Sequence, residues 1–330
     1  MLQGIGPTNT VLPPVISSTL YKSICLPKLT YGAELVNFPS DGISQHEKVQ
    51  EQIARYIQSL PQNVASPSVI APLGWLSVEA VCDMARLLYL WRLFALPWSC
   101  IYRKIVTVRI CHFIDSASSQ CHNLSVIFML YTVSKKYKLD HFITTWLING
   151  PHITYREWKT MVRNAVCERD KLVWKQKIQM YKSLDIYKSV IQFNSMCIWW
   201  KFSFTSTKYS RQSRDIIKLI CGSHSLHNGV KAKSNRVCQI CDMFETDSMC
   251  HMLIRCIALD ESRLPLMDAL LESLPKALRA HFLGVNDVEK TALLLSAFNS
   301  SFITEWKDIF TNCLLFVTNQ YSVRNELTNR

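Results

Sequence analysis

The feature that most constrains this chain is a cluster of thiols and one imidazole in its last third. In the spacing C-x2-C-x9-H-x4-C the four side chains are Cys238, Cys241, His251 and Cys256. Three thiolates and one imidazole form a Cys3His set, which closes a four-coordinate tetrahedral zinc site. A tight turn aims the first two sulfurs at one point, and His251 and Cys256 lie about one helical turn apart. The sequence therefore predicts one zinc ion held by these four residues.

Other side chains compete for the same role. Cys250 precedes His251, and His224 and His227 lie upstream, so each is an alternative ligand. A chance origin is a further alternative, because thirteen cysteines make a C-x2-C pair common. Four protein ligands leave no open coordination position, so the predicted zinc is structural rather than catalytic. A zinc deaminase would need H-x-E ahead of P-C-x2-C, and neither element is present.

Composition favours a mainly α-helical protein inside the cell. The chain has 330 residues and only nine glycines, and it contains long segments rich in Leu, Ile, Lys and Gln. No charged and apolar signal peptide precedes Lys22, the first basic residue, and many cysteines suit a reducing compartment. We therefore expect an intracellular, nuclear or cytoplasmic location. No apolar run approaches the ~18 residues of a membrane span, so no membrane partner is expected.

Positive charge is concentrated in the middle of the chain. The net charge is +12, and residues 135–236 carry 20 Lys and Arg against 6 Asp and Glu. Thr154 and Glu157 form a predicted capping box that opens a long basic helix. Cations for phosphates, interleaved with aromatic rings for base stacking, are typical of proteins that bind RNA or single-stranded DNA. A merely solvated helix face is the alternative.

The predicted nucleic-acid-binding residues are basic side chains of this segment together with two adjacent tryptophans. They are Lys159, Arg163, Lys171, Lys175, Lys177, Lys182, Trp199, Trp200 and Lys201. Tryptophans at helical spacing are more often core residues, so the charge is the stronger signal. Trp199 and Trp200 are the pair that we expect to be hardest to bury together.

Four segments follow from these patterns. We expect a thumb-like helical region at 1–134 and a basic helical segment at 135–236. A zinc knuckle at 237–262 and a helical cap at 263–330 complete the chain. Within the first segment, Ser44 and Glu47 form a predicted capping box, and Ser77 is a predicted helix cap.

Three stretches of the first segment resemble one part of a known protein family. LPKLTYGAELV, HEKVQEQIARYIQSLP and PLGWLSVEAV resemble the region that follows the polymerase palm in non-LTR (LINE-type) retrotransposon reverse transcriptases. The matching positions are Tyr31, Gly32, Glu34, Gln50, Gly74, Trp75 and Glu79, whereas Ser77 departs from the usual proline. A G-x-H-x-L turn (Gly222, His224, Leu226) and the terminal knuckle extend the resemblance over about residues 14–262. In that family this region forms a helical thumb that holds the template–primer duplex.

The resemblance does not extend to catalysis. A polymerase holds two Mg²⁺ ions with two or three carboxylates, which the family supplies from palm motifs that include an aromatic-x-Asp-Asp turn. This sequence has no Asp-Asp pair, and no endonuclease-like region precedes the thumb-like stretch. We expect a carboxy-terminal portion of such an element, either a truncated copy or a partial gene product.

Three classes of function remain, and the first is favoured. It is a non-catalytic, nucleic-acid-binding portion of a retroelement reverse transcriptase, stabilised by structural zinc. The alternative is a zinc-stabilised helical protein–protein interaction module, which would not need so basic a middle segment. An enzyme in its own right is the third class, but no phosphate-binding loop or locally paired catalytic set is present.

Overall fold

The computed structural model describes residues 12–36, 38–115, 125–181, 184–205, 207–222, 237–299 and 307–328. These residues are mainly helical and include no strand, only two isolated β-bridges. The prediction of a mainly α-helical chain is therefore confirmed. In the part of the chain that is described, no helix is both long and apolar enough to cross a membrane.

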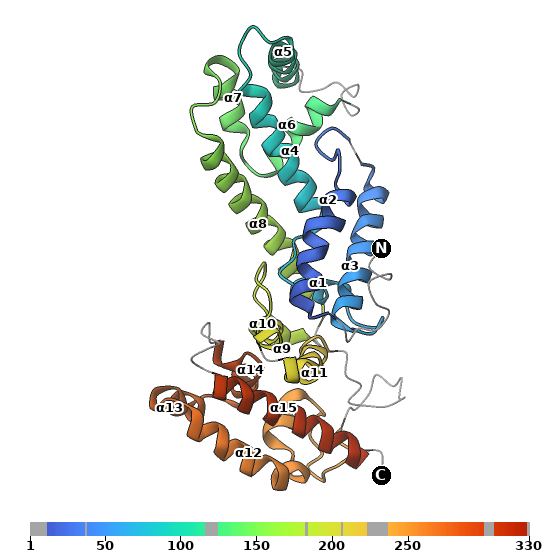
Figure 1. Ribbon diagram of the computed structural model, residues 1–330, viewed down its shortest axis with the longest axis vertical. Helices are drawn as coiled ribbons and strands as arrows, with labels where there is room; N and C mark the ends of the chain where they lie inside the picture. The colour runs from blue at the N-terminus through green and yellow to red at the C-terminus, as the bar shows by residue number, and fades with distance from the viewer. Residues whose placement is uncertain are drawn as a thin grey trace. The chain divides into compact units, whose positions relative to one another are not determined.

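The chain forms two compact units, each made of segments that are distant in sequence (Figure 1). Unit 1 contains Met1–Thr19, Ile53–Trp75 and Lys177–Arg330, and unit 2 contains Leu20–Gln52 and Leu76–Gln176. These boundaries differ from the four predicted segments, because packing brings together stretches that sequence order separates. The basic segment 135–236 is itself divided between the units.

Unit 2 is built mainly from helices of the first half of the chain. Its elements are η2 (Tyr21–Cys25), α2 (Leu26–Leu29), most of α3 (Ser40–Gln58), α4 (Val78–Phe94), α5 (Ile101–Asp115), α6 (Val126–Lys136), α7 (Asp140–Asn149) and most of α8 (Tyr155–Gln179). Helix α6 packs against α4, α5 and α7. The core includes Trp146 and Trp158, whose rings meet edge to face with centroids 4.8 Å apart.

Two of the three predicted caps in unit 2 are confirmed. The backbone N–H of Ala80 donates to Ser77 Oγ at the start of α4 (3.1 Å). At the start of α8, Glu157 Oε2 accepts from the N–H and the hydroxyl of Thr154, and Glu157 N–H donates back to Thr154 Oγ1. The box at Ser44 is wrong, because α3 already begins at Ser40 and Ser44 lies inside it. The Pro39 carbonyl already accepts from the N–H groups of Gly42 (2.9 Å) and Ile43 (3.2 Å), so the first free N–H groups of the helix lie upstream of Ser44.

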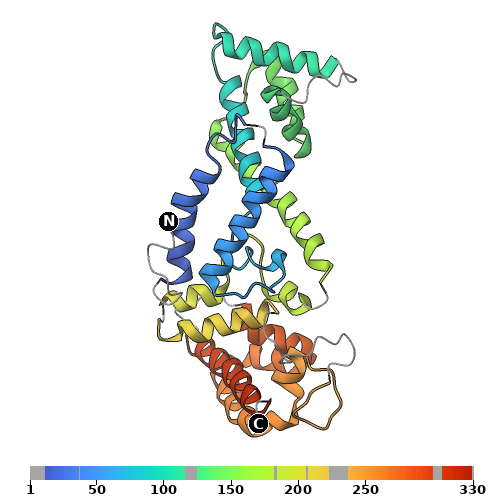
Figure 2. The ribbon, with the colours of Figure 1, turned by 90° about the vertical axis from the view of Figure 1, so that its right-hand side faces the viewer.

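Unit 1 contains the remaining elements, including both ends of the described chain. They are α1 (Pro14–Leu20), the end of α3, η3 (Ser66–Ser68), α9 (Asp185–Val190), α10 (Ile198–Thr205), η6 (Thr207–Tyr209), α11 (Ser210–Ile220), η7 (His251–Arg255), η8 (Ile257–Leu259), α12 (Asp260–Ser273), α13 (Lys276–Gly284), α14 (Asp287–Leu295), η9 (Ala297–Asn299) and α15 (Lys307–Thr328). Helix α15 packs along α12 and against α11, which in turn packs on α10 (Figure 2).

The two adjacent tryptophans belong to the core of unit 1. Trp199 and Trp200 are both fully buried in α10, so the expectation that they resist burial together is wrong. Each indole N–H has an internal acceptor: Trp199 donates to the carbonyl of Leu295 (2.6 Å), and Trp200 donates to Gln58 Oε1 (3.2 Å). Burying a tryptophan costs little once its one polar group is paired. These rings are not available to stack on bases.

Several positions that carry the family resemblance have structural roles. Gly74 has a positive φ of +63°, and a Cβ there would lie 2.7 Å from the backbone nitrogen of Met196, so only glycine fits. The Trp75 indole N–H donates to Ser18 Oγ (2.7 Å) within unit 1, and buried Gln50 donates to the carbonyl of Leu76 (3.0 Å) within unit 2. These residues shape the fold rather than a reactive site.

Candidate functional site

A short turn presents the first two predicted metal ligands. Val237 and Thr246 form an antiparallel bridge, and the N–H of Cys238 donates to the carbonyl of Glu245 (2.9 Å). These contacts close the turn that carries Cys238 and Cys241. Phe244 turns the chain back with a φ of +54°, in the left-handed region. A backbone loop of this kind lets two cysteines with two residues between them face one point.

The other two ligands come from the π-helical turn η7 that follows. The N–H of His251 donates to Ser248 Oγ (3.1 Å), and the N–H of Cys256 donates to the carbonyl of His251 (2.7 Å). Cys256 then leaves the turn in an extended conformation. The single wide turn therefore sets His251 and Cys256 on the same side of the chain, as their spacing predicts.

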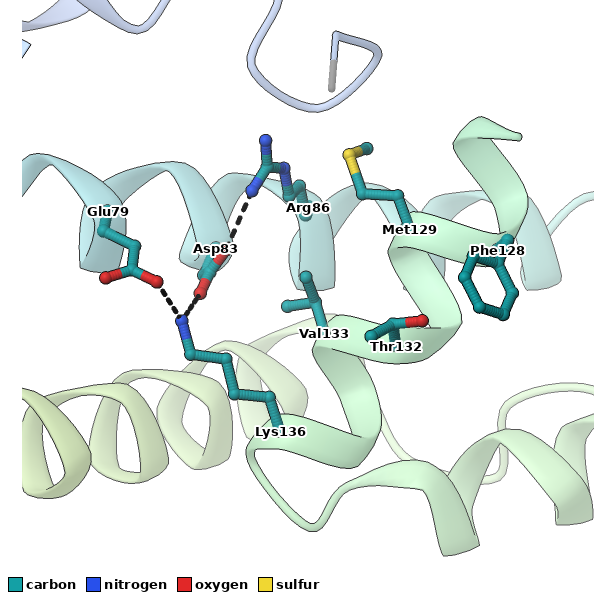
Figure 3. A pocket seen from close by; sticks show the side chains of 8 residues that line it. All are labelled: Glu79, Asp83, Arg86, Phe128, Met129, Thr132, Val133 and Lys136. Atoms are coloured by element: carbon teal, nitrogen blue, oxygen red, sulfur yellow. Dashed lines mark hydrogen bonds and ion pairs between the residues drawn. The ribbon is translucent and has the colours of Figure 1, made fainter. Parts of the chain in front are cut away.

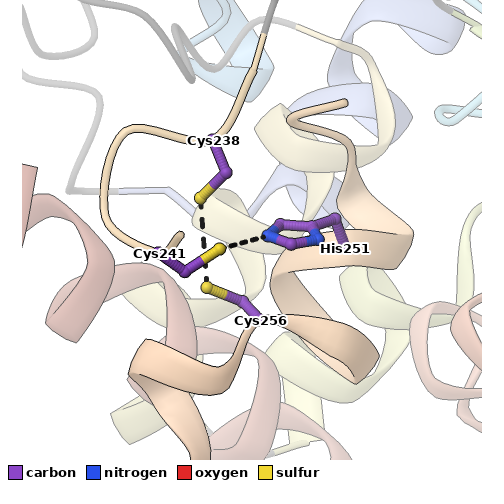
Figure 4. Close-up of side chains that lie close together, drawn as sticks. All are labelled: Cys238, Cys241, His251 and Cys256. Atoms are coloured by element: carbon purple, nitrogen blue, oxygen red, sulfur yellow. Dashed lines mark hydrogen bonds between the residues drawn. The ribbon is translucent and has the colours of Figure 1, made fainter. Parts of the chain in front are cut away.

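All four predicted ligands converge on one point (Figure 4). The Sγ atoms of Cys238, Cys241 and Cys256 and the ring nitrogen of His251 all lie within 4.8 Å of one another. The Sγ atoms of Cys238 and Cys256 are 4.0 Å apart, and Cys241 Sγ lies 3.3 Å from His251 Nε2. Tetrahedral zinc with ordinary bond lengths would require about 3.8 Å and about 3.6 Å for these two distances. The set is close enough to bind a metal ion and is compatible with zinc.

Of the alternative ligands, Cys250 does not join this group. The thiol of Cys250 interacts with the Thr291 side chain, and burial raises its pKa above the ordinary value. Cys250 is absent from the cluster that the four other side chains form. His224 and His227 lie outside the described residues, as does Leu226 of the predicted turn.

Glu245 contacts the imidazole of His251, one of the four predicted ligands, from its other ring nitrogen. Its Oε2 lies 3.1 Å from Nδ1 of buried His251, which leaves Nε2 directed at the cysteine sulfurs. Ligating histidines commonly donate their second ring N–H to a carboxylate, which fixes the tautomer that binds the metal. Arg255 continues the network, since it contacts Glu245 (3.7 Å) and Asp287 (2.7 Å).

A buried arginine lies against the Cys238 thiol of the cluster. Nη1 of Arg324, from α15, lies 3.9 Å from Cys238 Sγ, and Nη2 pairs with the carboxylate of Asp247. Burial alone raises the pKa of Cys238, but hydrogen bonds from the Ile240 N–H and from Arg324 outweigh it and lower the pKa to about 7. Metals bind the thiolate form of cysteine, so this environment suits a ligand. Sequence reasoning missed Arg324 because nothing in the spacing links it to the knuckle.

Most of the predicted basic residues fall on helix α8 of unit 2. The buried side chains of α8 follow a spacing of four residues, at positions 158, 162, 166, 174 and 178, with one position of the series, 170, only partly buried. Asp170 occupies the remaining position of this row, where its carboxylate accepts from the N–H and hydroxyl of Ser77 (3.0 and 2.8 Å). Residues four apart are neighbours on a helix surface, so this row, which winds slowly around α8 at 3.6 residues per turn, is the seam along which the helix packs.

A row of cations runs beside that seam, one residue further along. We call it the basic row of α8; its members are Lys159, Arg163, Lys171 and Lys175. Three of them are exposed, and Lys171 is partly exposed beside Glu168 (3.7 Å). Lys177 is exposed but off this row, and Lys201 is exposed on α10 in unit 1. Lys182 lies outside the described residues.

A pocket of about 400 Å³ lies between α4 and α6 in unit 2 (Figure 3). Its centre is the buried carboxylate of Asp83, which pairs with Arg86 (2.9 Å), Lys136 (2.6 Å) and the Tyr137 hydroxyl (3.0 Å). Lys136 also pairs with Glu79 at the mouth (2.6 Å). Two cations neutralise two carboxylates here, so the pocket presents no net charge to attract an ion.

Two features of the described chain thus carry recognisable chemistry. One is the group of Cys238, Cys241, His251 and Cys256, which we call the metal cluster, and the other is the basic row. The metal cluster is an enclosed ligand set in unit 1, and the basic row is an exposed row of cations in unit 2. No protein-family model, no curated protein and no solved structure matches this chain.

Proposed function

We propose that this chain is a non-catalytic protein that binds RNA or single-stranded DNA, with a structural zinc holding its carboxy-terminal part. The observation that carries the proposal is the basic row of α8. The resemblance of the sequence to the region after the palm of LINE-type reverse transcriptases supports the same class of partner. In that reading the chain contributes binding, and the chemistry of polymerisation lies elsewhere.

The basic row is suited to the phosphates of a nucleic-acid backbone. Each step of four residues advances about 6 Å along a helix and turns about 40° around it, so the row from Lys159 to Lys175 rises about 24 Å and winds around nearly half of α8, as a curved backbone could follow. The packing seam next to the row buries the apolar face of α8 and leaves these cations in solvent. Lysine and arginine side chains neutralise phosphates and release condensed counterions, which supplies affinity without sequence preference.

The corrected positions of the tryptophans change the expected mode of binding. With Trp199 and Trp200 in the core, no ring of that pair contributes base stacking. Binding should therefore depend mainly on charge and discriminate little between base sequences. We therefore propose that the α8 cations recognise the phosphate backbone of the nucleic acid.

Zinc fits the proposal as a structural ion. Four protein ligands complete a tetrahedral shell, which leaves no position for water or substrate. The Cys3His donor set, with a carboxylate behind the imidazole, matches the chemistry that zinc prefers. The buried carboxylate of Asp83, in the pocket of unit 2, already pairs with two cations and is not presented to a metal.

Salt dependence of binding tests the nucleic-acid proposal directly. Fluorescence anisotropy should show binding of a labelled single-stranded oligonucleotide that weakens steadily with added salt. A row of four contacts predicts a log–log slope of about −3, at about −0.7 per phosphate neutralised. Changing Lys159, Arg163, Lys171 and Lys175 together to Gln should abolish most of this slope and most of the affinity.

A matched variant controls for net charge. Lys28, Lys48, Lys276 and Lys307 are exposed and scattered over other elements, so changing these four to Gln removes the same charge without touching the basic row. This control should retain most of the affinity. Equal losses in the two variants would show that only overall charge matters, and absence of binding in the unmodified protein would refute the proposal.

A further inference from the structure

The metal cluster has one neighbour that comes from far along the chain. Arg324 lies near the end of α15, and its side chain is almost completely buried, with a residue exposure of 1%. Its guanidinium reaches Cys238 Sγ with Nη1 (3.9 Å) and the carboxylate of Asp247 with Nη2. Asp247 is also buried. The arginine is therefore clamped between a cluster thiol and a carboxylate.

The charges around the cluster show what Arg324 can contribute to it. Three thiolates and a neutral imidazole around a divalent ion leave a net charge of −1. A buried charge is costly unless an opposite charge lies close to it. On the Cys238 side the Arg324 guanidinium lies against the sulfur, but buried Asp247 pairs with the same guanidinium, so the two together add no net charge and act by holding the Cys238 thiolate in place. On the His251 side, Glu245 is in turn approached by Arg255.

We propose that Arg324 is a positioning residue of the metal centre, which couples zinc binding to the folding of helix α15. This inference rests on the zinc site of the proposed function. Helix α15 packs against η7, which carries His251, and along α12. Zinc therefore stabilises residues well beyond the knuckle segment 237–262 that the sequence predicts.

The coupling is tested by measuring zinc affinity through competition with a chromophoric chelator. Arg324→Gln should weaken zinc binding by about 10- to 100-fold, the loss typical of residues that support metal ligands. Arg324→Lys keeps the charge but loses the planar fork that spans two partners, so its loss should be smaller. Co²⁺ in place of zinc gives a second readout, because its visible spectrum reports a tetrahedral site with sulfur ligands.

Arg263 offers a matched control. It is a buried arginine of unit 1 that pairs with Asp260 and does not belong to the cluster. Arg263→Gln should lower stability while leaving the zinc affinity of the folded protein unchanged. An equal loss of zinc affinity in both variants would mean that general destabilisation, not contact with Cys238, is responsible.

A second measurement covers the case in which Arg324→Gln fails to fold. In the unmodified protein, zinc should slow amide hydrogen exchange in the last turns of α15 as well as in the knuckle. Protection confined to the knuckle would overturn the coupling, as would unchanged zinc affinity in folded Arg324→Gln. If the unmodified protein binds no zinc, both the zinc site of the proposed function and the coupling fail. If it binds zinc but α15 gains no protection, only the coupling fails.

Discussion

The metal cluster and the basic row of α8 show two different relations between sequence and structure. The cluster gathers its four ligands from within nineteen residues, Cys238 to Cys256, and three of the four are buried. The basic row is an exposed feature of one long helix. In the cluster the spacing of the ligands already implied their convergence. In the basic segment the overall charge was visible in sequence, but its arrangement was not.

The difference lies in which contacts decide each feature. Local hydrogen bonds such as Cys238 N–H to Glu245 and Cys256 N–H to His251 shape the ligand turn. The cations of the basic row remain in solvent because the neighbouring row of side chains on α8 is the one that packs. Packing between distant segments likewise buries Trp199 and Trp200, because Leu295 and Gln58 supply acceptors for their indole N–H groups. A local metal turn is therefore easier to predict than a binding surface.

The largest expected effect comes from removing a metal ligand. Cys256→Ser should abolish stoichiometric zinc and unfold the region around the knuckle, since structural zinc in small domains contributes about 10–16 kcal/mol. Elemental analysis and circular dichroism measure both effects. Cys250→Ser is the matched control and should retain zinc, because Cys250 lies outside the cluster. Full retention of zinc by Cys256→Ser would break the assignment.

The next effect separates core tryptophans from binding residues. Trp200→Ala should lower the free energy of unfolding by about 3–5 kcal/mol, because it leaves a cavity and removes the donor that pairs with Gln58 Oε1. Denaturant titration gives this value. Phe204→Ala, on the exposed side of the same helix, should change it by less than about 0.5 kcal/mol. A stable Trp200→Ala protein that no longer binds oligonucleotide would restore the stacking hypothesis.

A smaller effect distinguishes the basic row from the rest of α8. Lys175→Gln removes one member of the row, whereas Lys177→Gln removes an exposed cation two residues away on another face. The first change should flatten the salt slope of binding by about 0.7, and the second should leave it unchanged. Equal slopes for the two variants would show that the whole helix surface binds, without a preferred row.

The smallest effect concerns the cap of α8. Hydrogen bonds from the Thr154 N–H and hydroxyl lower the pKa of Glu157 below its ordinary value. A lowered folded-state pKa adds stability above the unfolded pKa of about 4.3, and this is lost as pH falls through the folded value. Melting temperatures of the unmodified protein and Glu157→Gln should therefore converge in acid. A constant difference down to low pH would contradict this cap.

The helical class, two helix caps and the convergence of Cys238, Cys241, His251 and Cys256 were all predictable from local patterns. Ser77 caps α4 and Thr154 pairs with Glu157 because caps depend on residues three apart. The two wrong predictions, the Ser44 capping box and the exposure of the tryptophan pair, depended on residues outside the local pattern. The box at Ser44 was overridden by an earlier helix start, and adjacent tryptophans found internal acceptors that sequence cannot reveal.

By itself the sequence determined the mainly helical fold class, the excess of positive charge in the middle of the chain and the four side chains that meet at the cluster. Only the tertiary structure decided which cations of α8 form one row, and which residues stand behind the ligands. Arg324 reaches Cys238 from another helix, and Gly74 is required by the nearby backbone of Met196. The physical reason is range: ligand spacing and caps depend on neighbours within a turn or two, whereas burial and charge compensation depend on contacts between segments far apart in sequence.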